Sequence, residues 1–540
     1  MKRALRTTAL RSRAAFNRAA PRRTFVNPAG PSKEVLPVDI TTLPNGVRVV
    51  TEPTPGYFSS VGVYIDAGSR YESPRLSGSS HIMDRMAFKT TSNRTAEEMS
   101  TGIDSLGGQV VCSSSRETIM YQSSHFHAGT PLAVSLLADT ILRPSFLPSE
   151  VSDTRDAAAY EIREITSKPE MIMPELLHQV AYQGNTLGNP LLCPEDRLEK
   201  VDANVLREYV DTWYRPERMV VAGAGMPHAQ LVDLAHEHFG ELKAKEVETP
   251  QPVVSPTASP SAGASRSTAT PTHLLPPPSS LSPSLYKTIT TAATSLFNPA
   301  PVQNPTSLVE PSFAELANMR ARYTGGHQFF HQLDMDMTHV YLGFDGLSIH
   351  DEDIYALATV QILLGGGGSF SAGGPGKGMY SRLYTHVLNH HSSIDHCSSF
   401  HHIYTDTSLF GLALTAHPHH SPSNLLPLLA HQLSLLLYHP IPLTELTRAK
   451  NQLMSSLMMA LESRIVEVED LGRQILVHGR KVSVQEMCDK IVQVNGDDVR
   501  RVMRRVVGEG MKVQPTVLVM GRQDVAPWEG VFKKYGLGRL

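Results

Sequence analysis

Cysteine is scarce in this chain: four residues are scattered over 540 positions, and none forms a CxxC pair. So little cysteine predicts a reducing compartment and excludes a fold held together by disulfide bonds. No run of 18 or more apolar residues occurs, so we expect no membrane-spanning segment. The formal net charge is -3, which gives no support for nucleic-acid binding. The chain is too long for one ordinary core, so two or more domains are expected.

Acidic residues are absent from the N-terminal stretch, where the first one is Glu34. The same stretch holds Lys2 and seven arginines among Ser, Thr and Ala residues. Such an Arg-rich, acid-free composition is typical of mitochondrial transit peptides. A basic tail that binds anionic surfaces is the alternative interpretation. We therefore assign residues 1–35 to a transit peptide and tail, and expect the mature chain in the mitochondrial matrix.

Charge is also nearly absent between Thr249 and Tyr286, where Arg266 is the only charged residue and Pro, Ser, Thr and Ala dominate. Such a stretch has too few apolar side chains to offset the entropy lost on ordering. We interpret residues 245–317 as a low-complexity linker rich in Pro and Ser.

The segments on either side of this linker, residues 36–244 and 318–540, show the same order of predicted elements. Each has an early strand pattern and, near its end, a helical pattern followed by another strand pattern. These patterns begin at Val61, Val201 and Met219 in the first segment and at Val340, Val494 and Thr516 in the second. Asn45-Gly46 between two strand patterns also predicts a hairpin. The sequence thus predicts an α+β protein made of two tandem homologous domains.

A possible metal motif lies in the stretch SGSSHIMDRMAFKTT around His81. It resembles the His-x-x-Glu-His motif of the pitrilysin/insulinase metallopeptidase family. In that motif two histidines four residues apart share one helical face and bind zinc. The glutamate activates the metal-bound water, and a distant acid completes the ligand set.

The resemblance fails at two of the four positions that carry this chemistry. His81 matches the first ligand, and Glu161 matches the distant acid. Asp84 replaces the catalytic glutamate and is one methylene shorter, while Arg85 replaces the second ligand with a permanent cation. We therefore expect no catalytic residue and no metal in this chain, and an ion pair of Arg85 with Asp84 or Glu161. Without the resemblance, an ordinary paired histidine would be the simpler interpretation of His81.

A glycine run between Gly365 and Gly378 is the most distinctive segment of the chain. Its glycines would let an extended peptide approach the backbone closely. The run does not fit a phosphate-binding loop, because a glycine follows Lys377 where Ser or Thr is needed. A plain flexible connector is the alternative. The residues predicted to contact a ligand are Gly365, Gly366, Gly367, Gly368, Ser369, Phe370, Gly373, Gly374, Gly376, Lys377 and Gly378.

The glycine run and the stretch from Tyr160 to Glu195 resemble the α subunits of mitochondrial processing peptidases. This resemblance covers roughly 36–244 and 318–540. It implies a heterodimer in which a β subunit supplies the zinc and the base, and this chain has no cofactor and is no enzyme by itself. It also implies that the glycine run binds the Arg-rich presequences of imported precursors.

Two other functions are compatible with this family. A structural core subunit of respiratory complex III has the same fold and also lacks zinc ligands, but has little use for the glycine run. An independently active metallopeptidase would have to function with Arg85 in the ligand position. Two further patterns are interpreted as structural: the histidines from His386 to His420 as the surface of strands, and Met454, Met458 and Met459 as core packing.

Overall fold

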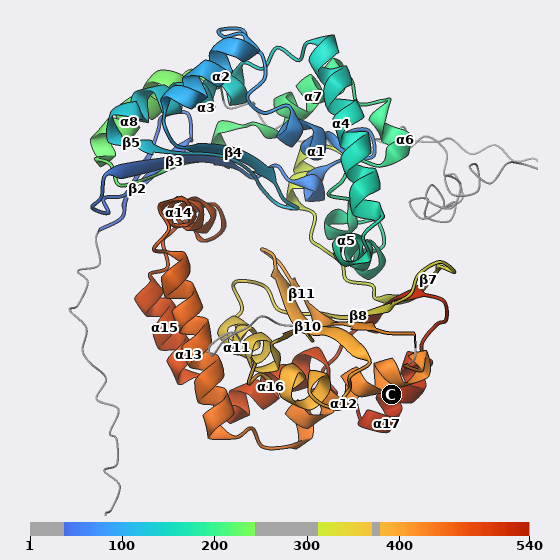
Figure 1. Cartoon of the computed structure of the whole chain (residues 1–540). Helices are drawn as coiled ribbons and strands as arrows, with labels where there is room; N and C mark the ends of the chain where they lie inside the picture. The colour runs from blue at the N-terminus through green and yellow to red at the C-terminus, as the bar shows by residue number, and fades with distance from the viewer. Residues whose placement is uncertain (1–36, 244–310, 370–378, 419, 539–540) are drawn as a thin grey trace, which may run out of the picture. The chain divides into compact units, whose positions relative to one another are not determined.

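The computed structural model describes residues 37–243, 311–369, 379–418 and 420–538 (Figure 1). The predicted transit peptide and most of the predicted linker lie outside these residues. The described part contains two six-stranded sheets, one in the first half of the chain and one in the second. In the described residues no helix is both long and apolar enough to cross a membrane.

The first sheet has the strand order β1-β2-β6-β3-β5-β4. Its central strands β3 and β6 are rich in small and β-branched residues and are almost entirely buried, as expected for a sheet covered on both faces. The predicted hairpin is present, because β1 and β2 pair antiparallel across Gly46, which has a positive φ of 101°. The strands are β1 (Asp39–Thr42), β2 (Arg48–Glu52), β3 (Phe58–Ile65), β4 (Gln109–Ser114), β5 (Ile119–Phe126) and β6 (Met219–Ala224).

The second sheet has the order β7-β12-β8-β11-β10-β9, and its first five strands repeat the topology of β2-β6-β3-β5-β4, whereas the edge strands β1 and β9 have no counterpart. In both sheets the last strand of the half lies between the first two long strands, parallel to one and antiparallel to the other. This agreement confirms the internal repeat predicted from the sequence. The strands are β7 (Gly326–His331), β8 (Thr338–Asp345), β9 (Gly366–Gly368), β10 (Ile394–Ile403), β11 (Ser408–Ala416) and β12 (Thr516–Gly521).

Helices surround both sheets. The first half contains α1 (Ser79–Arg85), α2 (Ala96–Ser105), α3 (Thr130–Leu142), α4 (Pro148–Thr166), α5 (Pro169–Tyr182), α6 (Glu195–Leu198), α7 (Ala203–Trp213) and α8 (His228–Phe239). The second half contains α10 (Phe313–Asn318), α11 (Ile354–Leu364), α12 (Leu425–Tyr438), α13 (Leu443–Ala460), α14 (Arg464–His478), α15 (Val484–Gln493), α16 (Gly496–Val506) and α17 (Trp528–Tyr535).

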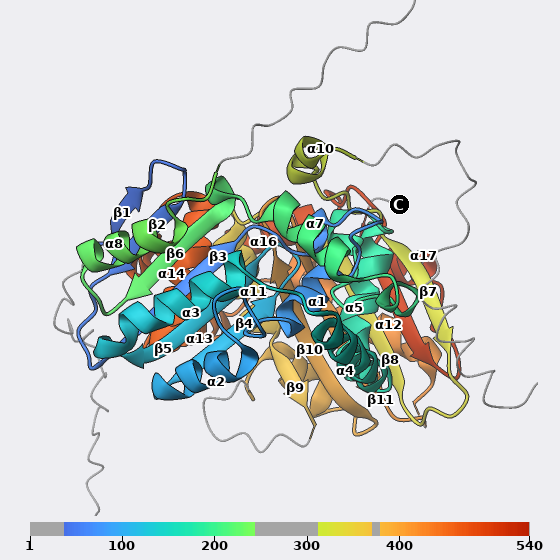
Figure 2. The ribbon, with the colours of Figure 1, turned by 90° about the horizontal axis from the view of Figure 1, so that it is seen from above.

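The two halves exchange one helix each. Helix α14 packs on the face of the first sheet opposite α3 and α8, where Val468, Leu471 and Ile475 meet the buried side of β3 and β6 (Figures 1 and 2). In return, α5 of the first half packs on β8 and β12 of the second sheet. Each sheet is therefore covered on one face by its own half and on the other by the opposite half.

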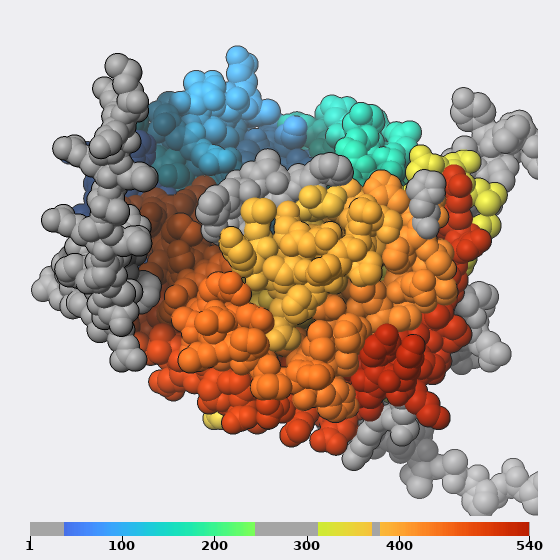
Figure 3. Space-filling model, turned by 60° about the horizontal axis from the view of Figure 1, so that its bottom comes forward, coloured from blue at the N-terminus to red at the C-terminus, as the bar shows by residue number. Residues whose placement is uncertain are grey.

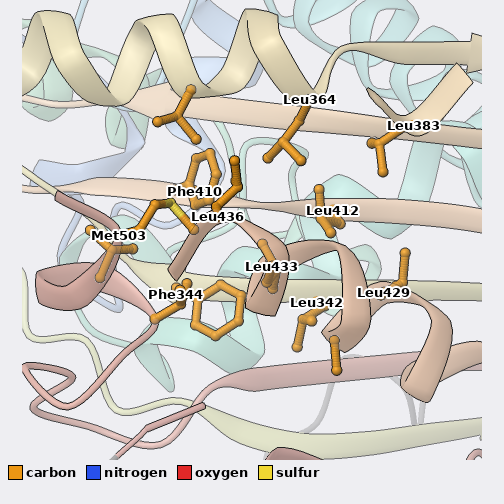
Figure 4. Close-up of a cluster of buried hydrophobic side chains, with 14 of the residues drawn as sticks. Leu342, Phe344, Leu364, Leu383, Phe410, Leu412, Leu429, Leu433, Leu436 and Met503 are labelled. Carbon is orange, nitrogen blue, oxygen red and sulfur yellow. The ribbon is translucent and has the colours of Figure 1, made fainter. Parts of the chain in front are cut away.

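The core of the second half lies between its sheet and its own helices. Leucines of α11 and α12 interdigitate there with Phe344, Phe410 and Met503 (Figure 4). The face of the second half in Figure 3 is formed by residues coloured gold to red. One sequence prediction is wrong here: Met458 and Met459 are exposed, because the face of α13 that packs inward carries Leu446 and Ala449 instead.

The last residues of the predicted linker, 245–317, are helical: α10 begins at Phe313 and ends at Asn318, one residue beyond the predicted boundary. Its Phe313 ring lies against Trp213 at 5.2 Å and beneath the Arg215 guanidinium at 3.5 Å. Just beyond α10, the Met319 carbonyl accepts a hydrogen bond from Arg70. Arg70 also forms ion pairs with Glu117 of the first half and Asp406 of the second, which fixes the entry into the second half.

Candidate functional site: a motif on α1 and α4, and a glycine strand

The start of α1 is anchored by a buried carboxylate. Gly78, with a φ of 86°, precedes the helix, and the carboxylate of Glu72 accepts hydrogen bonds from the backbone N–H groups of Gly78 (2.8 Å) and Ser80 (2.7 Å). Burial raises the pKa of Glu72 to about 7. This anchor fixes the first turn of α1, which carries His81.

His81 is buried, and its ring is oriented by a backbone group. Its Nδ1 accepts a hydrogen bond from the Cys193 N–H at 3.2 Å, so a neutral ring carries its proton on Nε2. That Nε2 faces Oε2 of Glu161 at 3.5 Å. A metal-binding histidine usually donates its second N–H to a carbonyl or carboxylate, leaving the other nitrogen free for the metal. In His81 the ring accepts a hydrogen bond from Cys193 instead of donating one, so the nitrogen left for a metal carries the proton.

Arg85 fills the position between α1 and α4. Its guanidinium binds both carboxylate oxygens of Glu161, from Nε at 2.8 Å and from Nη2 at 2.6 Å. The ion pair expected from the sequence is thus present, and it holds the pKa of Glu161 far below its usual range. A cation placed between His81 and Glu161 would have to displace a guanidinium that is always charged.

Asp84 is turned away from this position. Its Oδ2 accepts hydrogen bonds from the backbone N–H (2.9 Å) and the hydroxyl (3.2 Å) of Ser114 at the end of β4. Its Oδ1 lies 3.1 Å from Arg85. Both oxygens are therefore held by partners within the chain.

These four residues, the α1–α4 site (His81, Asp84, Arg85 and Glu161), lie together as the sequence predicted, but their donor set does not fit zinc. A closed zinc site needs three or four neutral or anionic ligands. Here Arg85 places a cation in one ligand position. His81, the one histidine of the site, carries the proton of its neutral ring on Nε2, the nitrogen that faces Glu161. Within the ranges that the structure describes, no three His, Cys, Asp or Glu side chains are grouped so as to hold a metal ion.

Three residues that shape this site were not predicted from the sequence: Glu72, Ser114 and Cys193. Glu72 accepts a hydrogen bond from a backbone N–H group, whereas Ser114 and Cys193 donate their own backbone N–H groups. A backbone hydrogen bond places no demand on the type of the residue that supplies the N–H. Neither Ser114 nor Cys193 therefore leaves a recognisable pattern.

The glycine run begins as a strand rather than as a loop. Residues Gly366–Gly368 form β9, the edge of the second sheet, and pair antiparallel with Ser398, Cys397 and His396 of β10. Gly366 has a φ of 98°, and a Cβ atom there would lie 2.0 Å from the Cys397 carbonyl oxygen. Only glycine fits this position.

After β9, the Ser369 N–H donates to the Asp395 carbonyl oxygen at 2.6 Å. Gly365, which precedes the strand, has a φ of 56° and accepts a hydrogen bond from the Ser399 N–H. The other predicted ligand contacts, Phe370, Gly373, Gly374, Gly376, Lys377 and Gly378, lie outside the described residues.

Two family profiles match the sequence. Insulinase (Peptidase family M16) matches residues 48–195, and Peptidase M16 inactive domain matches residues 200–274 and 305–453. The chain belongs to peptidase family M16. The first match contains the whole α1–α4 site, and the second contains the glycine strand.

Two curated relatives of this chain share one name. The chain is 46% identical over 492 residues to the mitochondrial-processing peptidase subunit alpha of Neurospora crassa, covering 87% of this chain and 83% of the relative. It is 32% identical over 505 residues to the human protein of the same name, covering 91% of this chain and 83% of the relative. The sequence therefore places this M16 chain among the α subunits.

Solved structures show the same M16 fold at lower identity. A chain of complex III2 from Candida albicans superposes with a TM-score of 0.67 at 16% identity, over 92% of this chain and 99% of that one. A protease from Helicobacter pylori gives a TM-score of 0.69 at 17% identity, over 90% and 100%. These likenesses support the predicted α+β architecture of two M16-type domains.

Proposed function

We propose that this chain is the non-catalytic, presequence-recognising subunit of a mitochondrial processing peptidase, located in the matrix and paired with a zinc-bearing β subunit. The observation that carries the proposal is the bidentate ion pair between Arg85 and Glu161. It places a fixed positive charge where an active member of the family binds zinc. The chain accordingly binds no zinc and needs a partner for hydrolysis.

The glycine strand supports a role in binding extended peptides. An edge strand exposes backbone hydrogen-bonding groups, and an incoming peptide can add to them as a further strand. Added Cβ atoms at Gly367 and Gly368 would meet no atom of the described residues within 4 Å, so the faces of β9 have room there for the side chains of a neighbouring peptide. In our proposal, Gly365 to Gly378 holds the presequence while the partner cuts it.

Reconstitution tests this function. The chain, the partner subunit and their mixture are each incubated with an Arg-rich leader fused to a folded reporter, and cleavage is followed by gel. We expect cleavage only by the mixture. Cleavage by the chain alone would contradict the proposal.

A matched deletion tests the role of the glycine run. Removing residues 370–378 from the chain should weaken leader binding by the mixture, while the zinc content of the partner stays unchanged. Deletion of an equally long stretch within residues 255–280 serves as the control and should leave binding intact. Equal loss in both variants would show that the glycine run has no specific role.

A further inference from the structure

A cavity of about 530 Å³ lies beside the α1–α4 site and has walls from both halves of the chain. The residues between β4 and β5, helix α5, the turn between β10 and β11, and helix α14 line it. Ser114, which binds Asp84, is one of the lining residues. The walls are joined by direct bonds, among them Tyr404 to His178 and Thr405 to Glu117.

The charges in the walls of this cavity are already neutralised. Arg116 and Glu175 are both buried and form an ion pair at 2.6 Å. Arg473 pairs with Glu469, and Asp470 pairs with Lys481. A charged ligand group would therefore meet side chains that are already paired, which disfavours it in this cavity.

Two histidines in the wall are uncharged aromatic groups at neutral pH. Nδ1 of His178 donates to the Pro174 carbonyl at 2.7 Å, and Nε2 accepts from the Tyr404 hydroxyl at 2.7 Å. Burial lowers the pKa of His178 far below its usual value and that of His402 to about 4. The His178 and His402 rings meet edge to face, with centroids 5.2 Å apart.

Apolar side chains remain uncovered at the cavity. Met171 on α5 is 49% exposed, and Ile403 at the end of β10 is 39% exposed. They come from opposite halves of the chain, and methionine adapts its shape to varied partners. Covering both of them would remove apolar surface from water and favour binding.

We propose that this cavity binds a large apolar side chain, aromatic or aliphatic, of a leader peptide. This proposal rests on the proposed function. Mitochondrial leaders are amphipathic, with apolar residues between the basic ones. The predicted leader of this chain itself carries Leu5, Leu10, Phe16 and Phe25 among its arginines. The cavity would bind one of these apolar side chains, whereas the arginine side chains would stay outside it.

A double-mutant cycle on the heterodimer tests the proposal. One probe is a synthetic peptide of residues 1–25, and the other is the same peptide with its two leucines and two phenylalanines changed to alanine. The variants are Met171→Gln and Ile403→Thr, both at exposed positions. The matched controls, Met458→Gln and Leu333→Thr, change exposed apolar residues that do not line the cavity.

For the unaltered leader, we expect the Kd, measured by fluorescence anisotropy, to rise about tenfold in the Met171→Gln/Ile403→Thr double variant. For the alanine-substituted leader, the same variant should leave Kd nearly unchanged. The control variants should bind both peptides like the wild type. Equal weakening of both peptides, or no change for either, would overturn the cavity proposal but leave leader binding by the heterodimer intact. Failure of the wild-type heterodimer to bind any leader would overturn the proposed function as well.

Discussion

Arg85 and Glu161 are half-exposed, so their ion pair adds little to stability despite its bidentate geometry. Its importance lies in its position. The guanidinium occupies both oxygens of Glu161, the acid that matches the distant ligand of the family motif, and it cannot lose its charge at physiological pH. We therefore propose that this one side chain keeps metal out of the α1–α4 site.

Restoring the family motif tests this interpretation. The double variant Arg85→His with Asp84→Glu supplies a second imidazole, frees Glu161 and lengthens the base. We expect the purified variant to take up zinc, measured by atomic absorption after dialysis, with the His81 ring released from Cys193 and its unprotonated nitrogen turned to the metal, whereas the wild type takes up none. The single variant Arg85→Ala controls for loss of the cation alone and should remain zinc-free. Zinc in the wild type would contradict the account.

Glu72 predicts a dependence of stability on pH. Its pKa of about 7 in the folded chain exceeds the ordinary value of 4.5, so the folded state holds this proton more tightly than the unfolded state. Its contribution is fully present below pH 4.5 and is lost as the pH rises through 7, by up to about 3 kcal/mol. Urea unfolding of wild type and Glu72→Gln between pH 5 and 8 should show a weaker decline for the variant. Parallel curves would refute this assignment.

The sequence predicted the members of the α1–α4 site because each occupies a position of the family motif, whether or not its residue type matches. It did not predict their orientation. The direction of Asp84 toward Ser114, and the tautomer imposed on His81 by Cys193, depend on backbone groups that only the folded chain brings near. The motif alone therefore indicates which residues meet but not how they are bonded.

At the scale of elements, the glycine run shows two different uses of glycine. Gly366 is required by close packing against β10, whereas Gly368 has open space where a side chain would be. The sequence could not separate these uses, because glycine gives no apolar pattern from which a strand can be recognised. Helix α13 shows a different limit: Met458 and Met459 fit an apolar core pattern in the sequence, but no neighbouring element covers them in the fold.

A matched pair of substitutions separates the two uses. Gly366→Ala should displace β9, at a cost of about 1–3 kcal/mol, because of its positive φ and the contact with Cys397. Gly368→Ala should be nearly neutral. Hydrogen exchange at the Ser369 and Ser399 amides, which donate hydrogen bonds on either side of β9, reports the difference. Similar exchange in the two variants would show that β9 does not depend on Gly366.

At the scale of the whole chain, the two halves are held together by the exchanged helices α5 and α14. The repeat was predictable because each half carries the same order of patterns. The exchange was not, because an amphipathic helix shows which face is buried but not which sheet buries it. Gly472 permits the close approach of α14, since a Cβ atom there would lie 2.1 Å from the Tyr64 ring.

Gly472→Ala should therefore destabilise the chain by about 1–3 kcal/mol, through overpacking against Tyr64. Gly530→Ala in α17 is the control: a Cβ atom there meets nothing within 4 Å, and alanine favours a helix, so stability should be unchanged or raised by up to about 1 kcal/mol. Thermal unfolding of both variants measures the contrast. Equal midpoints would mean that α14 does not need close contact with the first sheet.

The central claim is that this chain recognises leaders but cannot cut them. Its most direct test is the turnover of a fluorogenic Arg-rich leader peptide by the purified chain, with and without added zinc, before and after mixing with the β partner. The account predicts no turnover until the partner is added. Zinc-dependent turnover by the chain alone would contradict it.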